Sequence, residues 1–386
     1  MSTLIKNADV VTASEVLSGA DVLITDGKIT AVGYGLGEAD EVIDAGGAWL
    51  LPGFVDLHCH GGDGYEFMDA DEDGIRHIAK FHLENGTTSM LATTLAADAG
   101  ETDRCLYNLG KHLASKTGGT IVGVHLEGPW FNPEECGAQN PEYIKPHKAG
   151  ELTALLSKYP FIKRVSAAPE IEGGLQLGDE GSGLGLLMSV AHTAADFAEV
   201  EAAAAHGYTM MTHLYSGMRG VIRKNSFRVA GAVEAGLYLD DMYVEIIADG
   251  CHLPHELLKY IYKIKGEDRI CLITDAIRAA GMPNGAVTKI GSMERGLDVV
   301  VEDEVAKLPD RQSFAGSTAT TRRLFENMMA ATNGDAVAVA KMASTTPSRL
   351  VGLNDRGEVS VGKRADLVIM NKDYKIKNVI LNGEKI

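Results

Sequence analysis

Histidine and carboxylate side chains that could bind a metal ion lie at the ends of apolar, β-branched runs of the sequence. His58 and His60 are two residues apart in an extended segment, so both imidazoles point to the same side and can reach one ion. Glu127, His192 and His213 each end a later run. Two histidines and a carboxylate make the ligand set of a catalytic zinc site whose fourth position is open. These residues therefore predict a metal centre.

Each of these residues also has a structural alternative. Glu127 could form an ion pair with a lysine or arginine, and either His192 or His213 alone could be a hydrogen-bonded core histidine. Their shared position favours a function, because chance would scatter the 12 histidines over the chain. His125 shares a face with Glu127 and is expected beside the ligands, whereas Cys59 points the other way, into the core.

Asp275 ends the last run, in Ile273-Thr274-Asp275-Ala276. A carboxylate at that place can accept a proton from an attacking water, which makes it the candidate general base. Its alternative is the N-cap of the next segment. Asp249 and His252 supply a turn and an imidazole that could touch a substrate. The other histidines are expected on the surface: His77, His82, His112, His147, His206 and His255.

Alternating strands and helices are expected to position these residues. From about residue 53 to 351, apolar runs alternate with segments of helical period, a pattern typical of a parallel sheet. Eight such units predict a (β/α)8 TIM barrel, in which the carboxyl ends of the strands meet on one face. A doubly wound open sheet is the alternative. The expected strands are 54–58, 88–93, 121–127, 164–168, 186–192, 209–213, 243–248 and 270–275.

Three segments depart from this alternation. Residues 170–183 are rich in glycine and predict a poor helix, and an insertion at about 276–316 contains strand-like pieces. Both ends of the chain consist of short strand-like runs, too few on either side for a stable sheet. We therefore expect 1–52 and 351–386 to pair as a small β-sandwich domain beside a barrel of residues 53–350.

Composition limits the function further. Of the 386 residues, 45% are hydrophobic and 23% are charged, as in an ordinary globular protein. The net charge of −17 argues against nucleic acid or an anionic membrane as a partner. Five cysteines without a C-x-x-C spacing indicate a reducing compartment, and the chain shows no signal-peptide layout and no membrane-length apolar run, so a cytoplasmic location is expected. Nucleotide-binding and G-x-S-x-G motifs are absent.

The motifs together resemble those of the N-acetylglucosamine-6-phosphate deacetylase family of the amidohydrolase superfamily. The combination of LEGP followed by FNPE, then THL, then ADG-x-H is specific for this family within the superfamily. The similar segments are distributed over nearly the whole chain: PGFVDLHCHGG, HLEGPWFNPEECGAQNPEYI, AHTAAD, THLYSGM, AGA at 230–232, IIADGCH, TDA, AGSTATT, SRLVGL and GKRADLVIMN.

The resemblance implies a reaction and a set of roles. The reaction is metal-dependent hydrolysis of the N-acetyl group of N-acetyl-D-glucosamine 6-phosphate to glucosamine 6-phosphate and acetate. One or two divalent ions (Zn, Fe, Mn or Co) would be bound per subunit of a homodimer, with Asp275 as general base and then general acid. The implied main ligands are Glu127, His192 and His213, and those of a second site are His58 and His60. The implied sugar and phosphate contacts are Ala138, Gln139, Ser216, Gly217, Asp249, His252, Phe314, Ala315 and Gly316.

Three departures from the family pattern stand out. Gln139 replaces a histidine that donates to the substrate carbonyl, and Ser216-Gly217 replaces Asn-Ala. The family's phosphate-binding arginine has no direct counterpart, although Arg223 and Arg228 flank its place.

Three alternative functions stay open. The first is an N-acetylgalactosamine-6-phosphate deacetylase, which shares the motifs. The second is a cyclic-amide hydrolase, which would need a bridging lysine at the end of the third or fourth run, and neither run ends in one. The third is a non-catalytic metal-binding protein on a decayed barrel.

Overall fold

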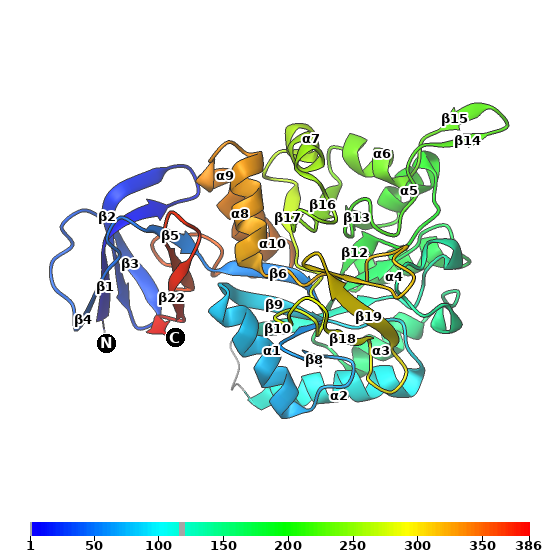
Figure 1. The fold of residues 1–386 in the computed structure, drawn as a ribbon, viewed down its shortest axis with the longest axis horizontal. Helices are drawn as coiled ribbons and strands as arrows, with labels where there is room; N and C mark the ends of the chain where they lie inside the picture. The colour runs from blue at the N-terminus through cyan, green and yellow to red at the C-terminus, as the bar shows by residue number, and fades with distance from the viewer. Residues whose placement is uncertain (1, 116–119) are drawn as a thin grey trace.

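Eight parallel strands form the centre of the computed structural model, which describes residues 2–115 and 120–386. They lie in the order β17-β16-β13-β12-β11-β10-β9-β6, and a bridge between Cys59 of β6 and Ala276, just after β17, closes the sheet. The sheet thus curls into a ring, which confirms the predicted barrel. Its strands lie among the helices at the centre of Figure 1. The strands are β6 (Phe54–Cys59), β9 (Thr87–Thr93), β10 (Ile121–Glu127), β11 (Ile162–Ala167), β12 (Leu187–Val190), β13 (Tyr208–Met211), β16 (Tyr243–Ile246) and β17 (Ile270–Leu272).

Helices follow the strands and cover the outside of the ring (Figure 1). Helix α1 shows why: Asp71 caps its start by accepting from the Gly74 N–H, and its buried residues include Ile75, Ile78 and Ala79, which recur at helical spacing. The helices are α1 (Glu72–Glu84), α2 (Ala99–Ser115), α3 (Glu151–Lys158), α4 (Gly174–Gly183), α5 (Phe197–Ala205), α6 (Ala232–Tyr238), α7 (His255–Lys265), α8 (Thr321–Ala331), α9 (Ala336–Ala340) and α10 (Thr346–Leu350).

The expectation of a poor helix after the fourth strand is wrong, because α4 forms there. Three of its four glycines (Gly174, Gly178 and Gly181) lie on the buried face, where they allow close packing rather than weaken the helix. A Cβ atom on Gly178 would lie 2.4 Å from the His206 carbonyl oxygen, and one on Gly181 would lie 2.1 Å from Met188 Sδ. Tertiary contact at these positions outweighs the low helix propensity of glycine.

Three histidines expected on the surface are buried instead. His82 and His112 follow the apolar residues of α1 and α2 at helical spacing, and each is at most 1% exposed. His82 contacts the Gly61 carbonyl oxygen through Nε2 at 2.9 Å. His147 is also buried, with Nε2 at 2.9 Å from Glu180 Oε2.

Insertions after the barrel strands shape the face at their carboxyl ends. The expected insertion after β17 forms a three-stranded sheet, and a short hairpin after β13 extends away from the body of the molecule (Figure 1). Helix α8 begins at Thr321, after this insertion. The inserted strands are β7 (Gly61–Gly62), β8 (Tyr65–Glu66), β14 (Ile222–Lys224), β15 (Phe227–Val229), β18 (Val287–Ile290), β19 (Leu297–Glu302) and β20 (Val305–Lys307).

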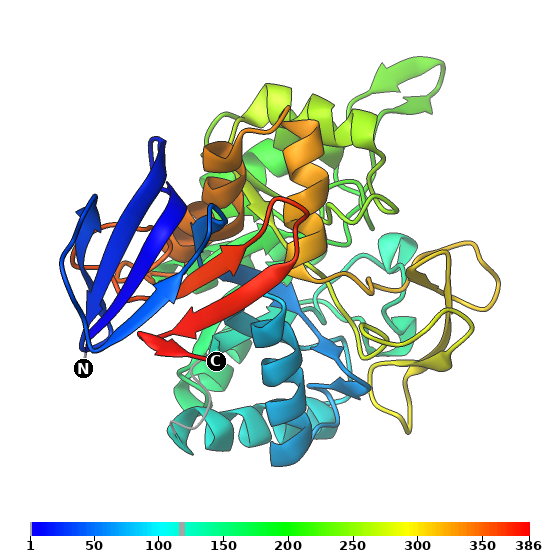
Figure 2. The same cartoon turned by 60° about the vertical axis from the view of Figure 1, so that its left-hand side comes forward.

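Segments from both ends of the sequence combine in one further sheet beside the barrel (Figure 2). Strand β5 pairs with β1 on one side and with β21 on the other, with Leu51 opposite Val368. Pairing of the two ends is thus as expected, while the boundaries 1–52 plus 351–386 and 53–350 stay predictions. The strands are β1 (Ser2–Val11), β2 (Val16–Thr25), β3 (Lys28–Gly33), β4 (Glu41–Asp44), β5 (Trp49–Pro52), β21 (Leu367–Met370), β22 (Ile376–Leu381) and β23 (Glu384–Lys385).

Within residues 2–115 and 120–386, none of the helices combines the length and the apolar character needed to cross a membrane.

Candidate active site

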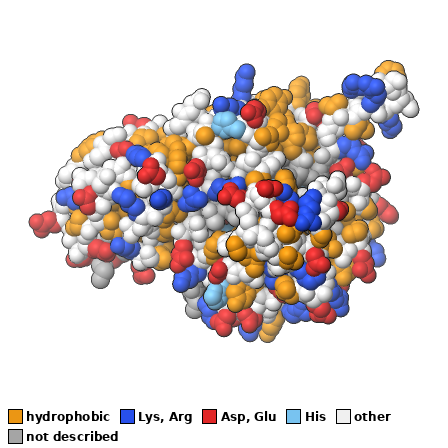
Figure 3. All heavy atoms as spheres, viewed as in Figure 1, with side chains coloured by type: hydrophobic (Ala, Val, Ile, Leu, Met, Phe, Trp, Pro, Cys, Tyr) orange, Lys and Arg blue, Asp and Glu red, His pale blue; other side chains and the backbone are white. Residues whose placement is uncertain are grey.

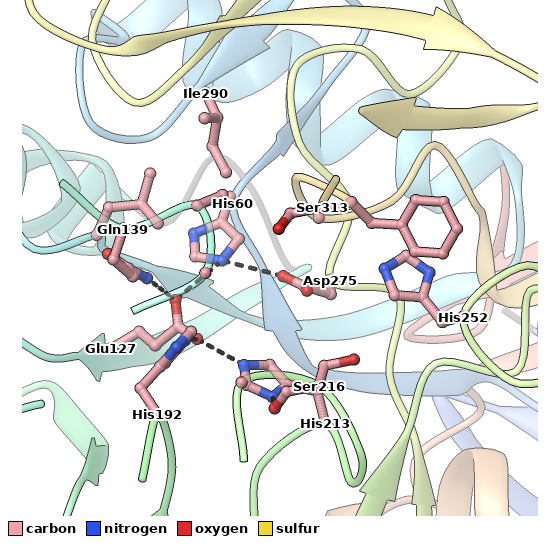
Figure 4. Close-up of a pocket in the computed structure, with 16 residues that line it drawn as sticks. His60, Glu127, Gln139, His192, His213, Ser216, His252, Asp275, Ile290 and Ser313 are labelled. Carbon is pink, nitrogen blue, oxygen red and sulfur yellow. Dashed lines mark hydrogen bonds and ion pairs between the residues drawn. The ribbon is translucent and has the colours of Figure 1, made fainter. Parts of the chain in front are cut away.

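A cavity of about 200 Å³ opens at the carboxyl ends of the barrel strands. It brings together most of the residues selected from the sequence, as Figure 4 shows for the polar ones. His58 lies directly behind His60, with their Nε2 atoms 3.2 Å apart. The predicted residues that line the cavity are His60, Glu127, Ala138, Gln139, His192, His213, Ser216, Gly217, His252, Asp275, Phe314 and Gly316.

Glu127, the last residue of β10, lies between two imidazoles that point at it. His213 Nε2 is 3.0 Å and His192 Nε2 is 3.2 Å from Glu127 Oε1. The Nδ1 atoms of the two rings face the carbonyls of Ser216 and Glu135, so Nδ1 carries the hydrogen and Nε2 the lone pair in a neutral ring. Burial holds the pKa of His213 below its ordinary value, which keeps that ring neutral. Lone pairs converging on a carboxylate require a cation among them, so this donor set fits a divalent metal ion.

Glu127 also belongs to a second group of potential ligands. His58, His60 and Glu127 each offer an atom within 4.8 Å of the others, and all three side chains are buried. Burial lowers the pKa of an imidazole, but Glu127 and Asp275 outweigh it and raise the pKa of His58 to about 9 and that of His60 to about 10. The cluster therefore strongly favours positive charge, as a metal site does.

Asp275 faces these groups from the last barrel strand. Its Oδ1 lies 3.1 Å from His60 Nε2, and its backbone N–H donates to the His58 carbonyl at 2.8 Å. Burial would raise the pKa of Asp275, but His58 and His60 hold it below its ordinary value, so the side chain is an anion at neutral pH. The carboxylate can therefore accept a proton.

Local backbone geometry fixes the direction of these side chains. His192, His213 and Asp275 have φ angles of 44°, 30° and 49°, in the left-handed region that residues other than glycine rarely adopt. Gly217 lies so close to His192 that a Cβ atom on it would be 2.7 Å from His192 Nδ1. The turns after β12 and β13 thus fit together only with a glycine at this position.

Gln139 spans the space between Glu127 and the strand next to it. The Ala96 N–H donates to Gln139 Oε1 at 2.8 Å, which fixes the orientation of the amide. Gln139 Nε2 consequently donates to Glu127 Oε2 at 2.6 Å. An amide nitrogen has two hydrogens, so a second donor remains at the cavity wall.

The opposite end of the cavity contains an aromatic pair and a fixed imidazole. The rings of His252 and Phe314 lie 4.7 Å apart between centroids. Asp249 lies behind His252 and accepts from its Nδ1 at 2.8 Å, and Ala315 is fully buried next to the cavity. Burial would raise the pKa of Asp249, but hydrogen bonds with His252 and with the Cys251 backbone hold it below its ordinary value. His252 therefore presents Nε2 to the cavity.

Arg223 and Arg228 do not lie at this cavity in the single chain. They face each other across the hairpin β14–β15, and both are exposed. Figure 3 shows blue side chains gathered on this hairpin at the upper right of the molecule. Their predicted contact with phosphate is untested within one subunit.

Several residues that shape the site were not selected from the sequence. Leu95, Ile290 and Ser313 line the cavity. Below it, Arg164 Nη2 donates to Glu245 Oε2 at 2.8 Å, and that oxygen lies 3.5 Å from His58 Nδ1. The sequence did contain a signal for this pair: Arg164 and Glu245 are charged residues within apolar strands, and a buried charge needs a partner.

Comparisons with known proteins agree with this geometry. A sequence model of the amidohydrolase family matches residues 49–386, which include every barrel strand. An N-acetylglucosamine-6-phosphate deacetylase of Bacillus subtilis (strain 168) is 34% identical over 99% of this chain and 96% of its own. The chain belongs to the N-acetylglucosamine-6-phosphate deacetylase family of amidohydrolases. The family resemblance expected from the motifs is therefore confirmed.

Other members of the amidohydrolase family extend the comparison. An N-acetylgalactosamine-6-phosphate deacetylase of Escherichia coli O157:H7 is 31% identical over 87% of each chain. Among solved structures, a mutant Mycobacterium smegmatis N-acetyl-D-glucosamine-6-phosphate deacetylase in complex with N-acetyl-D-glucosamine-6-phosphate has a TM-score of 0.91 at 31% identity. It covers 100% of this chain and 99% of its own. The Thermotoga maritima enzyme has a TM-score of 0.87 at 32% identity, with 99% of both chains covered.

Proposed function

We propose that this amidohydrolase removes the acetyl group from N-acetyl-D-glucosamine 6-phosphate and releases glucosamine 6-phosphate and acetate. One observation carries the proposal: a carboxylate that can accept a proton, Asp275, lies beside a buried group of two histidines and a glutamate in one cavity. The names of the family's full-length relatives support the substrate. N-acetylgalactosamine 6-phosphate is the second candidate, since a relative with that name covers most of the chain.

A divalent ion in the site would polarise the amide carbonyl and make water a better nucleophile. Glu127, His192 and His213 would hold the main ion, and His58 and His60 with Glu127 could hold a second. The donor types admit Zn, Fe, Mn or Co.

The chain's own groups would carry the proton and orient the amide. Asp275 accepts the proton of the attacking water and returns it to the leaving nitrogen, so one residue serves both halves of the reaction. The free N–H of Gln139 donates to the carbonyl oxygen without a formal charge, in place of the family's histidine. His252, held by Asp249, and the backbone at Ser216 and Gly217 bind the sugar hydroxyls.

Phosphate recognition is proposed to require a second subunit. A dianion needs cationic donors, and the exposed pair Arg223 and Arg228 is carried on an arm that extends away from its own cavity (Figure 1). In a homodimer this arm could reach the partner's cavity, as the family resemblance implies. A cytoplasmic location also stays a proposal, in keeping with the five free cysteines among the described residues.

Deacetylation kinetics on four compounds test the function: N-acetylglucosamine and N-acetylgalactosamine, each with and without the 6-phosphate. We expect N-acetylglucosamine 6-phosphate to have the highest kcat/KM, at least about 100-fold above free N-acetylglucosamine, since each lost charge-assisted contact costs about 1.5–3 kcal/mol. Equal rates with and without phosphate would contradict the substrate class. A preference for the galacto epimer would establish the second candidate instead.

A further inference from the structure

The candidate active site has an apolar wall at one end of its cavity, and the ring of Phe314 lines the other end. Leu95, which follows β9, and Ile290, the last residue of β18, line the cavity next to Gln139. Both side chains are buried, with 8% and 4% exposed. In Figure 4, Ile290 points toward His60 from the side opposite His213.

A second, smaller cavity of about 30 Å³ lies behind this wall. Among the residues that the structure describes, the two cavities share four lining residues: Leu95, Ala138, Gln139 and Ile290. Leu297 lines the small cavity but not the catalytic cavity. The side chains of Leu95 and Ile290 therefore lie between the catalytic cavity and this small cavity.

The arrangement of polar groups decides which part of the substrate meets this wall. The scissile carbonyl must lie among Glu127, Gln139 and Asp275, because these groups would perform the reaction. The sugar needs hydrogen-bonding partners, which the cavity offers at its other end with Ser216 and His252. The methyl of the acetyl group, the apolar end of the amide, is then left to face Leu95 and Ile290.

We propose that Leu95 and Ile290 form the acyl subsite and restrict the enzyme to short N-acyl groups. The proposal rests on the proposed deacetylase function and adds the acyl specificity. It assigns to these residues a role in specificity rather than in catalysis. A propionyl or butyryl group would have to displace the wall to reach the small cavity.

Buried contacts hold the wall in place. The Gly291 N–H, next to Ile290, donates to Glu66 Oε2 at 3.0 Å, and Arg278 Nη2 donates to the Gly291 carbonyl at 2.6 Å. Glu66 is fully buried and Arg278 is 3% exposed. Arg278 Nε also lies 3.1 Å from Glu66 Oε2. Because a buried pair of this kind is costly to break, the end of β18 cannot easily move away to admit a larger acyl group.

Kinetics on N-acetyl-, N-propionyl- and N-butyrylglucosamine 6-phosphate test the proposal, with Leu95→Ala and Ile290→Ala as variants. One extra methylene in an apolar pocket changes specificity by roughly 10–200-fold, so the wild type should prefer acetyl over propionyl by at least about tenfold. Each variant should reduce this ratio by at least about fivefold, because it opens the wall. Leu297→Ala, which enlarges only the small cavity, should keep the wild-type ratio of acetyl to propionyl hydrolysis.

Variants with smaller changes keep the test possible if an alanine variant does not fold. If thermal denaturation shows that an alanine variant is unfolded, Leu95→Val and Ile290→Val should move the ratio in the same direction by a smaller factor. An unchanged acetyl preference in folded variants that still deacetylate would overturn the acyl subsite alone. If the wild type hydrolyses none of the compounds, the proposed function fails, and the acyl subsite fails with it.

Discussion

Replacing Gln139 by methionine should weaken metal binding without touching a metal ligand. Methionine has a similar length and shape but no hydrogen-bonding amide. The change removes the donor that lies 2.6 Å from Glu127 Oε2 and the acceptor that lies 2.8 Å from the Ala96 nitrogen. Gln139 and Glu127 are 4% and 2% exposed, so water cannot easily replace either partner.

The size of the effect follows from the two hydrogen bonds. A buried hydrogen bond to an ionised group is worth about 1.5–3 kcal/mol, or roughly 10–150-fold in an equilibrium constant. Removing such an outer partner of a metal ligand typically costs about 10–100-fold in affinity. We therefore expect the Kd for Zn²⁺ to rise by about 10–100-fold. The unsatisfied Ala96 N–H should also lower the free energy of unfolding by about 1–3 kcal/mol.

Competition with a fluorescent zinc chelator measures the Kd, and urea unfolding of metal-free protein measures stability. Gln176→Met is the matched control, because Gln176 is exposed on α4, outside the cavity. The control should leave both quantities unchanged. A Gln139→Met variant with wild-type zinc affinity would refute the reasoning, since Glu127 would then be oriented by its histidine partners alone.

Three further results are expected. Asp275→Asn should lower kcat by at least about 1,000-fold with unchanged metal content, because general acid–base catalysis is worth roughly 10²–10⁴ and this residue serves both steps; retention of a tenth of kcat would place the base elsewhere. Exhaustive chelation should abolish activity, a divalent ion should restore it, and elemental analysis should find His213→Ala depleted of metal; full turnover by metal-free protein would disprove the mechanism. Burial lowers the pKa of His82 from 6.5 to about 4, so the folded state binds a proton less readily than the unfolded state. The free energy of unfolding should therefore fall by about 3 kcal/mol as the pH is lowered between these values. Urea unfolding of His82→Gln should show a weaker dependence on pH. A pH dependence equal to that of the wild type would contradict the lowered pKa of His82.

The polar half of the site could be predicted from the sequence because, in a barrel, the position of a residue along its strand indicates the face on which the residue lies. Glu127, His192 and His213 follow buried runs in strands far apart in sequence, yet the ends of parallel strands meet on one face. This argument applies to any side chain at a strand end. It gives no distances, so the amide bridge from Ala96 through Gln139 to Glu127 became visible only in the structure.

Residues selected by packing rather than by chemistry could not be found in this way. Leu95 and Ile290 are ordinary apolar residues, and their proposed role in acyl specificity follows only from the cavities on either side of them. Gly178 lowers helix propensity, and only the neighbouring backbone explains why it belongs in a helix. His82 is different: its spacing from Ile78 and Ala79 on α1 already indicated the buried face.

The sheet built from both ends of the sequence constrains the order in which the protein can be completed during synthesis. Strand β5 leaves the ribosome more than 300 residues before β21, its neighbour, so one edge of β5 has no partner through most of translation. Pairing of β21 with β5 then anchors the start of β6, since the Gly53 N–H donates to the Asp366 carbonyl at 2.8 Å. Strand β6 carries His58, whose carbonyl accepts from Asp275 where the barrel closes. A nascent chain therefore contains Glu127, His192 and His213 well before residues 366–370 emerge, but the contact beside Asp275, the proposed general base, is anchored only after they have emerged.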